Sequence, residues 1–271
     1  MENVLLEARH VSKIFGGLTA VNEVDMKVKQ GDIFGIIGPN GAGKTTFFNM
    51  CTGFYSVSSG SIWFDGENIT NLPCDRIAHK GIARTFQNIK LFKYMTVLEN
   101  VAIGSHINTK TNIFDAILHT KKYREDEAYV KEKGMEILKD VGLLEYADMA
   151  AGNLPYGVQR KVEIARALAV NPKMILLDEP AAGMNPKETD SLMDFIKMLN
   201  QEGGYTIALI EHDMKFVMNS CNQIMVLNFG EKICEGTAEE VKNDSKVKEA
   251  YFGKGIQASR GMIGQEVSAS C

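Results

Sequence analysis

Residues 38–45, GPNGAGKT, combine glycines, a lysine and a threonine at the spacing that binds phosphate. The segment fits the pattern GxxxxGK[ST] and stands between an apolar run, IFGII, and a helix-favouring stretch, TTFFNM. Glycines let the backbone wrap closely around phosphate oxygens, so that successive N–H groups and a helix N-terminus face the anion. The alternative to a phosphate-binding loop is a glycine-rich turn that matches the pattern by chance. The strand pattern before it and the helix pattern after it make this alternative less favoured. The predicted nucleotide-binding residues are Gly38, Pro39, Asn40, Gly41, Ala42, Gly43, Lys44, Thr45 and Thr46.

Within this loop, Lys44 is expected to reach the β- and γ-phosphates of ATP, and the Thr45 hydroxyl to ligate Mg²⁺. A second candidate lies farther along the chain, where the apolar run MILLD ends in Asp178 and Glu179 follows. Asp178 is expected to hold Mg²⁺, and Glu179 to act as the general base for the attacking water. An apolar strand followed by Asp-Glu often occurs by chance and does not by itself indicate a function. The phosphate loop upstream gives this one a function.

The elements that must position these residues follow from hydrophobic patterning. Continuous apolar runs at residues 33–38, 174–178, 206–211 and 224–229 are typical of strands buried on both faces of a parallel sheet. Helical stretches separate them, as in the segment after Asn185, where apolar residues recur at helical spacing. The alternation predicts a doubly wound α/β core.

Two further regions differ from this core. Residues 5–11 and 24–28 alternate apolar and polar side chains, which predicts strands of a small antiparallel β subdomain. Between about residues 89 and 170 only helical patterns occur, and Thr96 with Glu99 forms a capping box at the start of one helix. We therefore expect an all-helical subdomain inserted in the α/β core.

Composition restricts the function further. The 271 residues carry a net charge of −4, which gives no electrostatic basis for binding nucleic acid. The five cysteines are scattered and form no CxxC pair, so a reducing cytoplasm is expected. The N-terminal residues have no secretory-signal pattern, and no run of about 18 apolar residues predicts a membrane span.

Taken in chain order, these motifs resemble the ABC ATPase family over residues 5–253. The resemblance rests on VSKIFGG with Phe15, the phosphate loop, RTFQ with Gln87, LPYGVQR at residues 154–160, DEP at residues 178–180, and IEHD with His212. It implies a P-loop NTPase (RecA-like) core in a single ABC ATPase domain, residues 1–253, followed by a disordered tail, residues 254–271.

The same resemblance assigns roles to three of these residues. Phe15 is expected to stack on adenine, although a packing aromatic is the alternative. Gln87 is expected to contact the Mg²⁺–water shell, to contribute to catalysis and to move the helical insertion. His212 is expected at the γ-phosphate as a third catalytic residue beside Glu179 and Gln87, although a surface histidine is the alternative. A permease is expected to dock near Gln87 and residues 88–95.

Two departures from the family pattern concern partnership. The family signature is commonly LSGGQ, whereas this chain has Pro155 at the serine position and Val158 at the glutamine position. Proline is tolerated at the first position of a helix, and Gly157 keeps a backbone donor there. Since the signature faces the ATP of the other subunit in a head-to-tail dimer, the altered residues favour a second, non-identical ABC ATPase subunit. In place of a common aspartate the chain has Asn185, which with Pro186 and Glu188 fits a helix cap, and dimer contact is the secondary role.

Three segments resemble the ATPases of branched-chain amino acid importers: AAGMNPKET, RTFQNIKLFKYMTVLENV and GTAEEVKND…VKEAYFG. The last contains a second capping box, Thr237 with Glu240. This resemblance implies transmembrane permease subunits, an external solute-binding protein and a peripheral location on the cytoplasmic face of the cell membrane. Alternatives are urea or amide import, lipopolysaccharide export, a soluble ABC ATPase of DNA repair or translation, and a regulatory module without hydrolysis.

Overall fold

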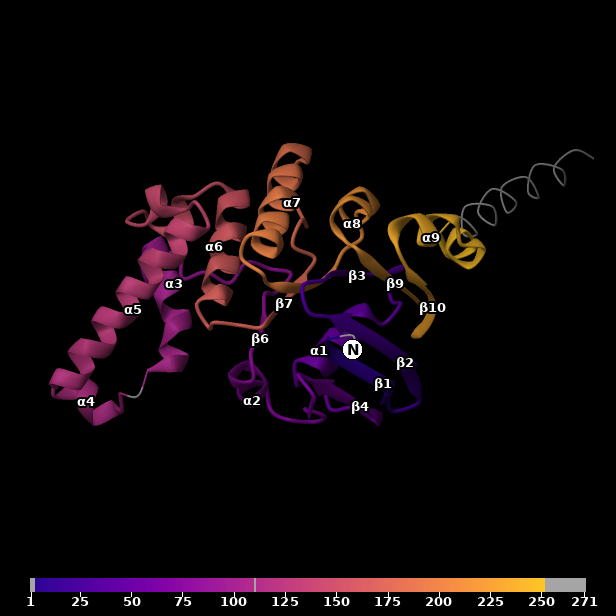
Figure 1. The fold of residues 1–271 in the computed structure, drawn as a ribbon, viewed down its shortest axis with the longest axis horizontal. Coiled ribbons are helices and arrows are strands. Elements are labelled where there is room, and N and C mark those ends of the chain that lie inside the picture. Colours follow the sequence, from indigo (N-terminus) through magenta and orange to yellow (C-terminus); the bar gives the residue numbers. More distant parts are fainter. Residues whose placement is uncertain (1–2, 110, 252–271) are drawn as a thin grey trace, which may run out of the picture.

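The computed structural model describes residues 3–109 and 111–251, and its centre is a six-stranded sheet (Figure 1). The strands lie in the order β10-β9-β3-β8-β7-β6. All neighbours are parallel except β10, which pairs antiparallel with β9 at one edge. The strand bounds are β3 (Ile33–Ile37), β6 (Ile82–Arg84), β7 (Met174–Asp178), β8 (Thr206–Ile210), β9 (Gln223–Asn228) and β10 (Glu231–Gly236). The predicted parallel core is confirmed, and β6 and β10 are additional strands that the apolar pattern did not indicate.

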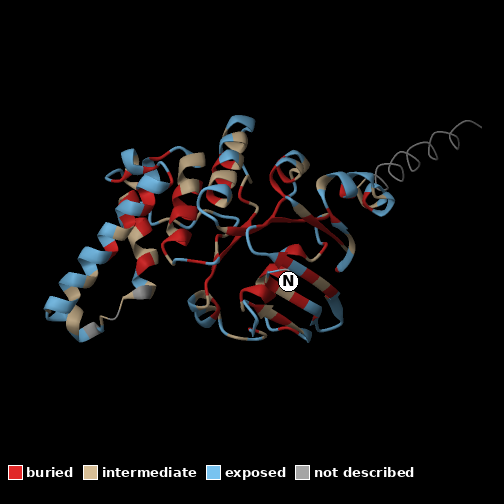
Figure 2. Ribbon diagram, in the orientation of Figure 1, coloured by how far each residue is buried: buried red, intermediate tan, exposed pale blue. Residues whose placement is uncertain are grey.

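Side chains on the two faces of this sheet enter two different cores. In β3, Phe34 and Ile36 pack into one core, while Ile33 and Ile37 pack into the other. Successive residues of a strand point to opposite faces, so a strand with two buried faces needs the continuous apolar run seen in the sequence. Figure 2 shows the central strands of this sheet as buried, whereas the edge strand β10 is largely exposed.

The first core is shared with a four-stranded antiparallel sheet in the order β2-β1-β4-β5. Its strands are β1 (Val4–Phe15), β2 (Leu18–Lys29), β4 (Ser59–Phe64) and β5 (Glu67–Asn68). Two helices belong to this part of the chain, α1 (Lys44–Cys51) and α2 (Cys74–His79). Phe47 and Phe48 of α1 are fully buried in this core, which fixes the position of the helix that follows the phosphate loop. The predicted small antiparallel subdomain is confirmed.

The second core is covered by helices. Those between β6 and β7 are α3 (Val97–Ser105), α4 (Ile113–Ile117), α5 (Lys121–Asp140) and α6 (Tyr156–Leu168). Later in the chain come α7 (Pro186–Gln201), α8 (Met214–Ser220) and α9 (Ala238–Asn243). Figure 1 shows α3, α4 and α5 as an arm at one end of the molecule, with α6 between this arm and the sheet. The described part of the chain has no named strand between β6 and β7, as expected for the helical insertion.

Side-chain caps start several of these helices where the sequence predicts them. Thr96 with Glu99, Asn185 with Glu188 and Thr237 with Glu240 all form reciprocal capping boxes, at α3, α7 and α9. Among the described helices, none is both long and apolar enough to cross a bilayer. The tail expected at residues 254–271 lies outside the described residues, as does the end of the expected domain at residue 253.

Candidate nucleotide-binding and catalytic site

The phosphate loop connects the end of β3 to the start of α1. Gly38, Gly41 and Gly43 have φ angles of 153°, 79° and 95°. A Cβ atom on Gly38 would lie 2.0 Å from the Leu227 carbonyl oxygen, and one on Gly43 would lie 2.5 Å from the Ala20 carbonyl oxygen. Side chains are excluded at both positions by backbone contact as well as by φ. The glycines therefore allow the loop to pack closely against β9 and β2.

Lys44 is the first residue of α1 and is 7% exposed. Its ammonium donates to the carbonyl oxygens of Gly38 and Pro39, at 2.7 and 3.1 Å. Burial lowers the pKa of Lys44, and the nearby carboxylates of Glu179 and Asp178 oppose this shift. The lysine thus lies across the loop with its charge close to both carboxylates.

A cleft of about 730 Å³ opens beside the loop. Its walls include Phe15 on one side and Glu179 on the other, with the loop, Lys44 and Thr45 between them. The full lining is Phe15, Leu18, Thr19, Ala20, Asn40, Gly41, Ala42, Gly43, Lys44, Thr45, Thr46, Glu179 and Phe229. A volume of this size and shape suits a nucleotide. The structure therefore brings together the residues expected to bind phosphate, adenine and the attacking water.

Phe15 ends β1 and is 41% exposed. Its ring packs edge-on against Tyr55, with ring centroids 5.3 Å apart, and the Lys13 ammonium lies 5.0 Å from the Phe15 centroid. Neither Tyr55 nor Lys13 was identified from sequence. Both hold Phe15 at the mouth of the cleft, where its exposed ring is available for stacking on a flat base.

Asp178 lies at the carboxyl end of β7 and is 4% exposed. The Arg84 guanidinium Nη2 donates to its carboxylate at 2.7 Å, while Arg84 Nη1 donates to Asn49 and Thr52. The hydroxyl of Thr45, the amide of Gln87 and the carboxylate of Asp178 are oxygen donors of the kind that Mg²⁺ takes. Their chemistry therefore fits the expected magnesium site. In proteins, Mg²⁺ usually has few protein ligands and keeps several waters.

Glu179 follows immediately in a left-handed conformation with φ of 45°. The Gln87 side-chain amide donates to its carboxylate at 2.7 Å. His212, whose side chain is 62% exposed, has Nδ1 4.0 Å from the same carboxylate oxygen. The three residues predicted to be catalytic therefore meet around one oxygen atom. Their catalytic roles stay predictions.

Sequence reasoning missed Glu211, the residue before His212. It is fully buried, and its carboxylate accepts from the Ala181 backbone N–H at 2.7 Å and from that of His212 at 3.1 Å. Burial raises the pKa of Glu211, partly offset by these hydrogen bonds. Glu211 thereby fixes the loop after Glu179 to the loop that carries His212. A carboxylate at the end of a parallel strand was the available signal.

The segment LPYGVQR starts α6, but one detail differs from expectation. Pro155 is the N-cap residue, with extended backbone, and not the first helical residue, which is Tyr156. A proline at the N-cap provides no side-chain oxygen for the first N–H groups of the helix. Gly157 lies in the first turn, and a Cβ there would lie 3.3 Å from Glu188 of α7. The expected cap at Asn185 is confirmed, since Asn185 accepts from the Glu188 N–H at 3.0 Å.

Comparisons with known proteins agree with this geometry. The family model described as ABC transporter matches residues 21–182, and the model described as branched-chain amino acid ATP-binding cassette transporter matches residues 231–256. The high-affinity branched-chain amino acid transport ATP-binding protein BraF of Pseudomonas aeruginosa is 45% identical over 254 residues, 94% of this chain and 100% of BraF.

Solved structures give the same result. The ADP conformation of MJ1267, an ATP-binding cassette of an ABC transporter, is similar with a TM-score of 0.80 and 38% identity, covering 93% of this chain and 99% of MJ1267. The dimeric post-hydrolysis state of the cassette MJ0796, bound to ADP and Pi, has a TM-score of 0.70 at 26% identity, covering 86% of this chain and 99% of MJ0796. The chain therefore belongs to the ABC transporter family and is an ATP-hydrolysing cassette of that family.

Proposed function

We propose that this ATPase subunit energises the import of branched-chain amino acids. The support for the substrate class is the likeness to BraF and the match of residues 231–256 to the branched-chain model. The ATPase part of the proposal depends on a single observation. Glu179 lines the same cleft as Lys44 and Thr45 and is hydrogen-bonded by Gln87.

In the proposed reaction, adenine stacks on Phe15 and the phosphates lie on the loop from Gly38 to Thr46. The Lys44 ammonium turns toward the β- and γ-phosphates. Their negative charge offsets the free-energy cost of removing this ammonium from water. Glu179 accepts a proton from the water that attacks the γ-phosphate, while Gln87 holds the Glu179 carboxylate and His212 contacts the transferred group. Mg²⁺, which Thr45, Gln87 and Asp178 would hold, supplies charge stabilisation to the phosphate oxygens.

A second cassette completes the site in this proposal. The dimeric state of the MJ0796 structure supports the pairing of two cassettes. Because Pro155 and Val158 alter the segment that would face the partner's ATP, we propose a non-identical partner in a head-to-tail dimer. Hydrolysis at the site built on Lys44 and Glu179 then uses the partner's signature segment. Purified chain that hydrolyses ATP cooperatively at full transporter rates without any partner would contradict this point.

The permease subunits dock, in this proposal, where the core meets the helical insertion. A groove of about 340 Å³ lies there, between β6 and α2 on one side and α3 and α6 on the other. Its walls include the apolar Phe54, Phe86 and Ile103 together with Arg84 and Arg166. An external solute-binding protein would deliver the amino acid, and the cassette would lie peripherally on the cytoplasmic face of the membrane.

Replacing Glu179 by Gln tests the reaction. The variant keeps the shape of the side chain but cannot accept a proton, so turnover should fall by about 10²-fold or more while ATP still binds. Size-exclusion chromatography should show an ATP-bound dimer that wild-type protein forms only transiently. Unchanged turnover in E179Q would exclude Glu179 as the base.

Two further measurements separate nucleotide binding from substrate class. Calorimetry with magnesium and ATP should give heat of binding for wild-type chain and much less for Lys44→Ala. Reconstitution with the permeases and second ATPase encoded by the neighbouring genes should drive uptake of leucine, isoleucine or valine. Uptake of urea or a short amide instead would keep the ATPase and replace the substrate.

A further inference from the structure

Tyr156, the first residue of α6, joins two segments that nothing in the sequence connects. Its hydroxyl donates to the Ala182 carbonyl oxygen at 3.1 Å, in the loop that follows Glu179. The same hydroxyl lies 3.5 Å from Nη2 of Arg160, one turn farther along α6. The three atoms nearest to the position that a Cβ on Gly183 would occupy all belong to Tyr156, at 3.8 to 3.9 Å. The signature pattern LSGGQ has glycine at this position, and a glycine has no side chain that could make these contacts.

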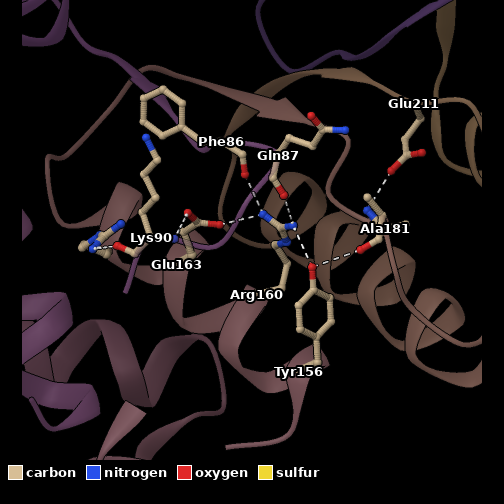
Figure 3. Close-up of polar contacts among 10 residues, drawn as sticks. Phe86, Gln87, Lys90, Tyr156, Arg160, Glu163, Ala181 and Glu211 are labelled. Carbon is tan, nitrogen blue, oxygen red and sulfur yellow. Dashed lines mark hydrogen bonds and ion pairs between the residues drawn. The ribbon is translucent and has the colours of Figure 1, made fainter. Parts of the chain in front are cut away.

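Arg160 extends this connection to the loop that carries Gln87 (Figure 3). Its side chain is fully buried, and its charge is paired with Glu163 at 2.8 Å. Nη2 of Arg160 donates to the Gln87 carbonyl oxygen at 2.6 Å, and Nη1 donates to the Phe86 carbonyl oxygen at 2.7 Å. A buried guanidinium with this many oriented acceptors has little freedom to move alone, because a lost partner would leave a buried charge unsatisfied.

Two further hydrogen bonds to the backbone of this loop also come from α6. Glu163 accepts from the Lys90 backbone N–H at 3.2 Å, and Arg166 donates to the Lys90 carbonyl oxygen at 2.7 Å. With the two bonds from Arg160, the backbone from residue 86 to residue 90 is held to one helix. A displacement of α6 therefore displaces the main chain of Gln87 with it.

Both connections lead to Glu179 and together form a closed ring of contacts. We call this ring the circuit, and it consists of Tyr156, Arg160, Gln87, Glu179 and Ala182. On one side, Ala182, which accepts from Tyr156, donates its N–H to the Glu179 carbonyl oxygen at 3.1 Å. On the other side, Gln87, which Arg160 holds by its main chain, donates its side-chain amide to the Glu179 carboxylate at 2.7 Å. The backbone and the carboxylate of Glu179 are thus each connected to α6, and Tyr156 is the residue at which the two paths meet.

We propose that Tyr156 is a positioning residue that couples the start of α6 to the orientation of Glu179 in the same subunit. This inference depends on the proposed function, in which the start of α6 faces the partner's ATP. Binding of that ATP shifts α6, and the circuit carries the shift to the general base of this subunit's own site. The two ATP sites of the dimer then influence each other, as a coupling free energy between sites requires.

A purely structural role for Tyr156 would depend on its ring, which packs against Gly183, and not on its hydroxyl. Tyr156→Phe separates the two, because it keeps the ring and removes both hydrogen bonds. Tyr156 is 39% exposed, so water can replace the lost bond to Ala182 and the variant is expected to fold normally. Tyr129→Phe is the matched control, since Tyr129 is an exposed tyrosine of α5 outside the circuit.

The experiment uses the full chain assembled with its partner ATPase and permeases in lipid vesicles. For Tyr156→Phe we expect a kcat for ATP hydrolysis roughly 2- to 10-fold below wild type, the range that a hydrogen bond of ordinary net strength allows. The KM for ATP at the site built on Lys44 should stay unchanged, because Tyr156 does not line that cleft. The thermal midpoint should match wild type, and Tyr129→Phe should behave as wild type in all three measurements.

A double-mutant cycle with Gln87→Ala identifies the circuit. Because both connections end at Glu179, adding Tyr156→Phe to Gln87→Ala, which already frees the Glu179 carboxylate, should change kcat by less than about twofold. Effects that simply multiply would overturn the proposal, as would a wild-type kcat in Tyr156→Phe. Wild-type assemblies that hydrolyse no ATP would instead refute the proposed function, which keeps the two failures distinct.

Discussion

Arg84 and Asp178 form a buried ion pair between the neighbouring strands β6 and β7, with Nη2 2.7 Å from the carboxylate and each side chain 6% exposed. Arg84 also lines the groove proposed for permease docking. One guanidinium therefore contacts the expected magnesium ligand on one side and that groove on the other.

Replacing Arg84 by Ala should lower the free energy of unfolding by about 3–5 kcal/mol, because Asp178 would keep a buried charge without its partner. Urea unfolding of the full chain measures this loss. Lys173→Ala is the control, since Lys173 pairs with Asp65 at the surface and its removal should cost about 1 kcal/mol or less. Equal losses in the two variants would show that burial adds nothing to the Arg84 pair.

The exposed ring of Phe15 predicts a contribution to ATP affinity but not to phosphate affinity. Phe15→Ala should weaken ATP binding by about 1–3 kcal/mol, the value of stacking one base on an aromatic ring. Calorimetry with inorganic tripolyphosphate should give the same affinity for both proteins, since the loop is untouched. Phe114→Ala, an exposed phenylalanine of α4, is the control. Equal weakening toward both ligands would place the effect in the loop and not at adenine.

Asn185 should act mainly as a helix cap. Asn185→Ala removes the acceptor for the Glu188 N–H and should cost about 1 kcal/mol of stability, measured by thermal or urea unfolding. Asn185→Asp keeps an acceptor and should match wild type in stability. ATPase activity of the assembled transporter should also survive in Asn185→Asp. A large loss of activity in that variant, at unchanged stability, would make dimer contact the main role.

Glu211 predicts a pH-dependent stability of defined sign. Burial raises the pKa of Glu211 in the folded chain, although His212, 3.7 Å away, opposes this shift. The contribution of Glu211 to stability is therefore fully present below the unfolded-state pKa. That contribution is lost as pH rises through the raised folded-state value. Glu211→Gln does not titrate, so its free energy of unfolding relative to wild type should increase as pH rises from about 4 to 7.

Glu240 provides a control of opposite sign. Its hydrogen bonds with Thr237 lower its pKa in the folded chain, so its contribution is present above the unfolded-state pKa and is lost as pH falls. Glu240→Gln should therefore become less stable relative to wild type as pH rises. Unfolding curves at several pH values compare the two variants. The same slope for both would contradict the assignment for Glu211.

Local patterns explain why much of the fold and site was predictable. The phosphate loop depends on residues adjacent in sequence, and the strands β3, β7, β8 and β9 needed only an apolar run. Each of these was predicted to within a residue of its end; Phe229, for example, lies one residue past β9. The capping boxes were equally local, because both partners lie within one helical turn.

Contacts between segments far apart in sequence were not predictable in this way. Tyr55 reaches Phe15 only because β1 and the segment after α1 fold side by side, and Arg84 reaches Asp178 only through the pairing of β6 with β7. Tyr156 was overlooked for another reason. Comparison with the usual signature drew attention to the missing hydroxyl at Pro155, whereas the new hydroxyl one residue later contacts a loop that sequence alone cannot place.

The neighbours of β3 have a consequence for biosynthesis. Within residues 3–109 and 111–251, the strand that leads into the phosphate loop pairs with β8 and β9. Gly38 lies against Leu227, and the Gly230 N–H donates to the Ala42 carbonyl oxygen. These partners are synthesised after residue 45, so the loop cannot reach its observed packing before residue 230 has been made. We therefore expect a nascent chain to bind nucleotide only after β9 and Gly230 have folded against the loop.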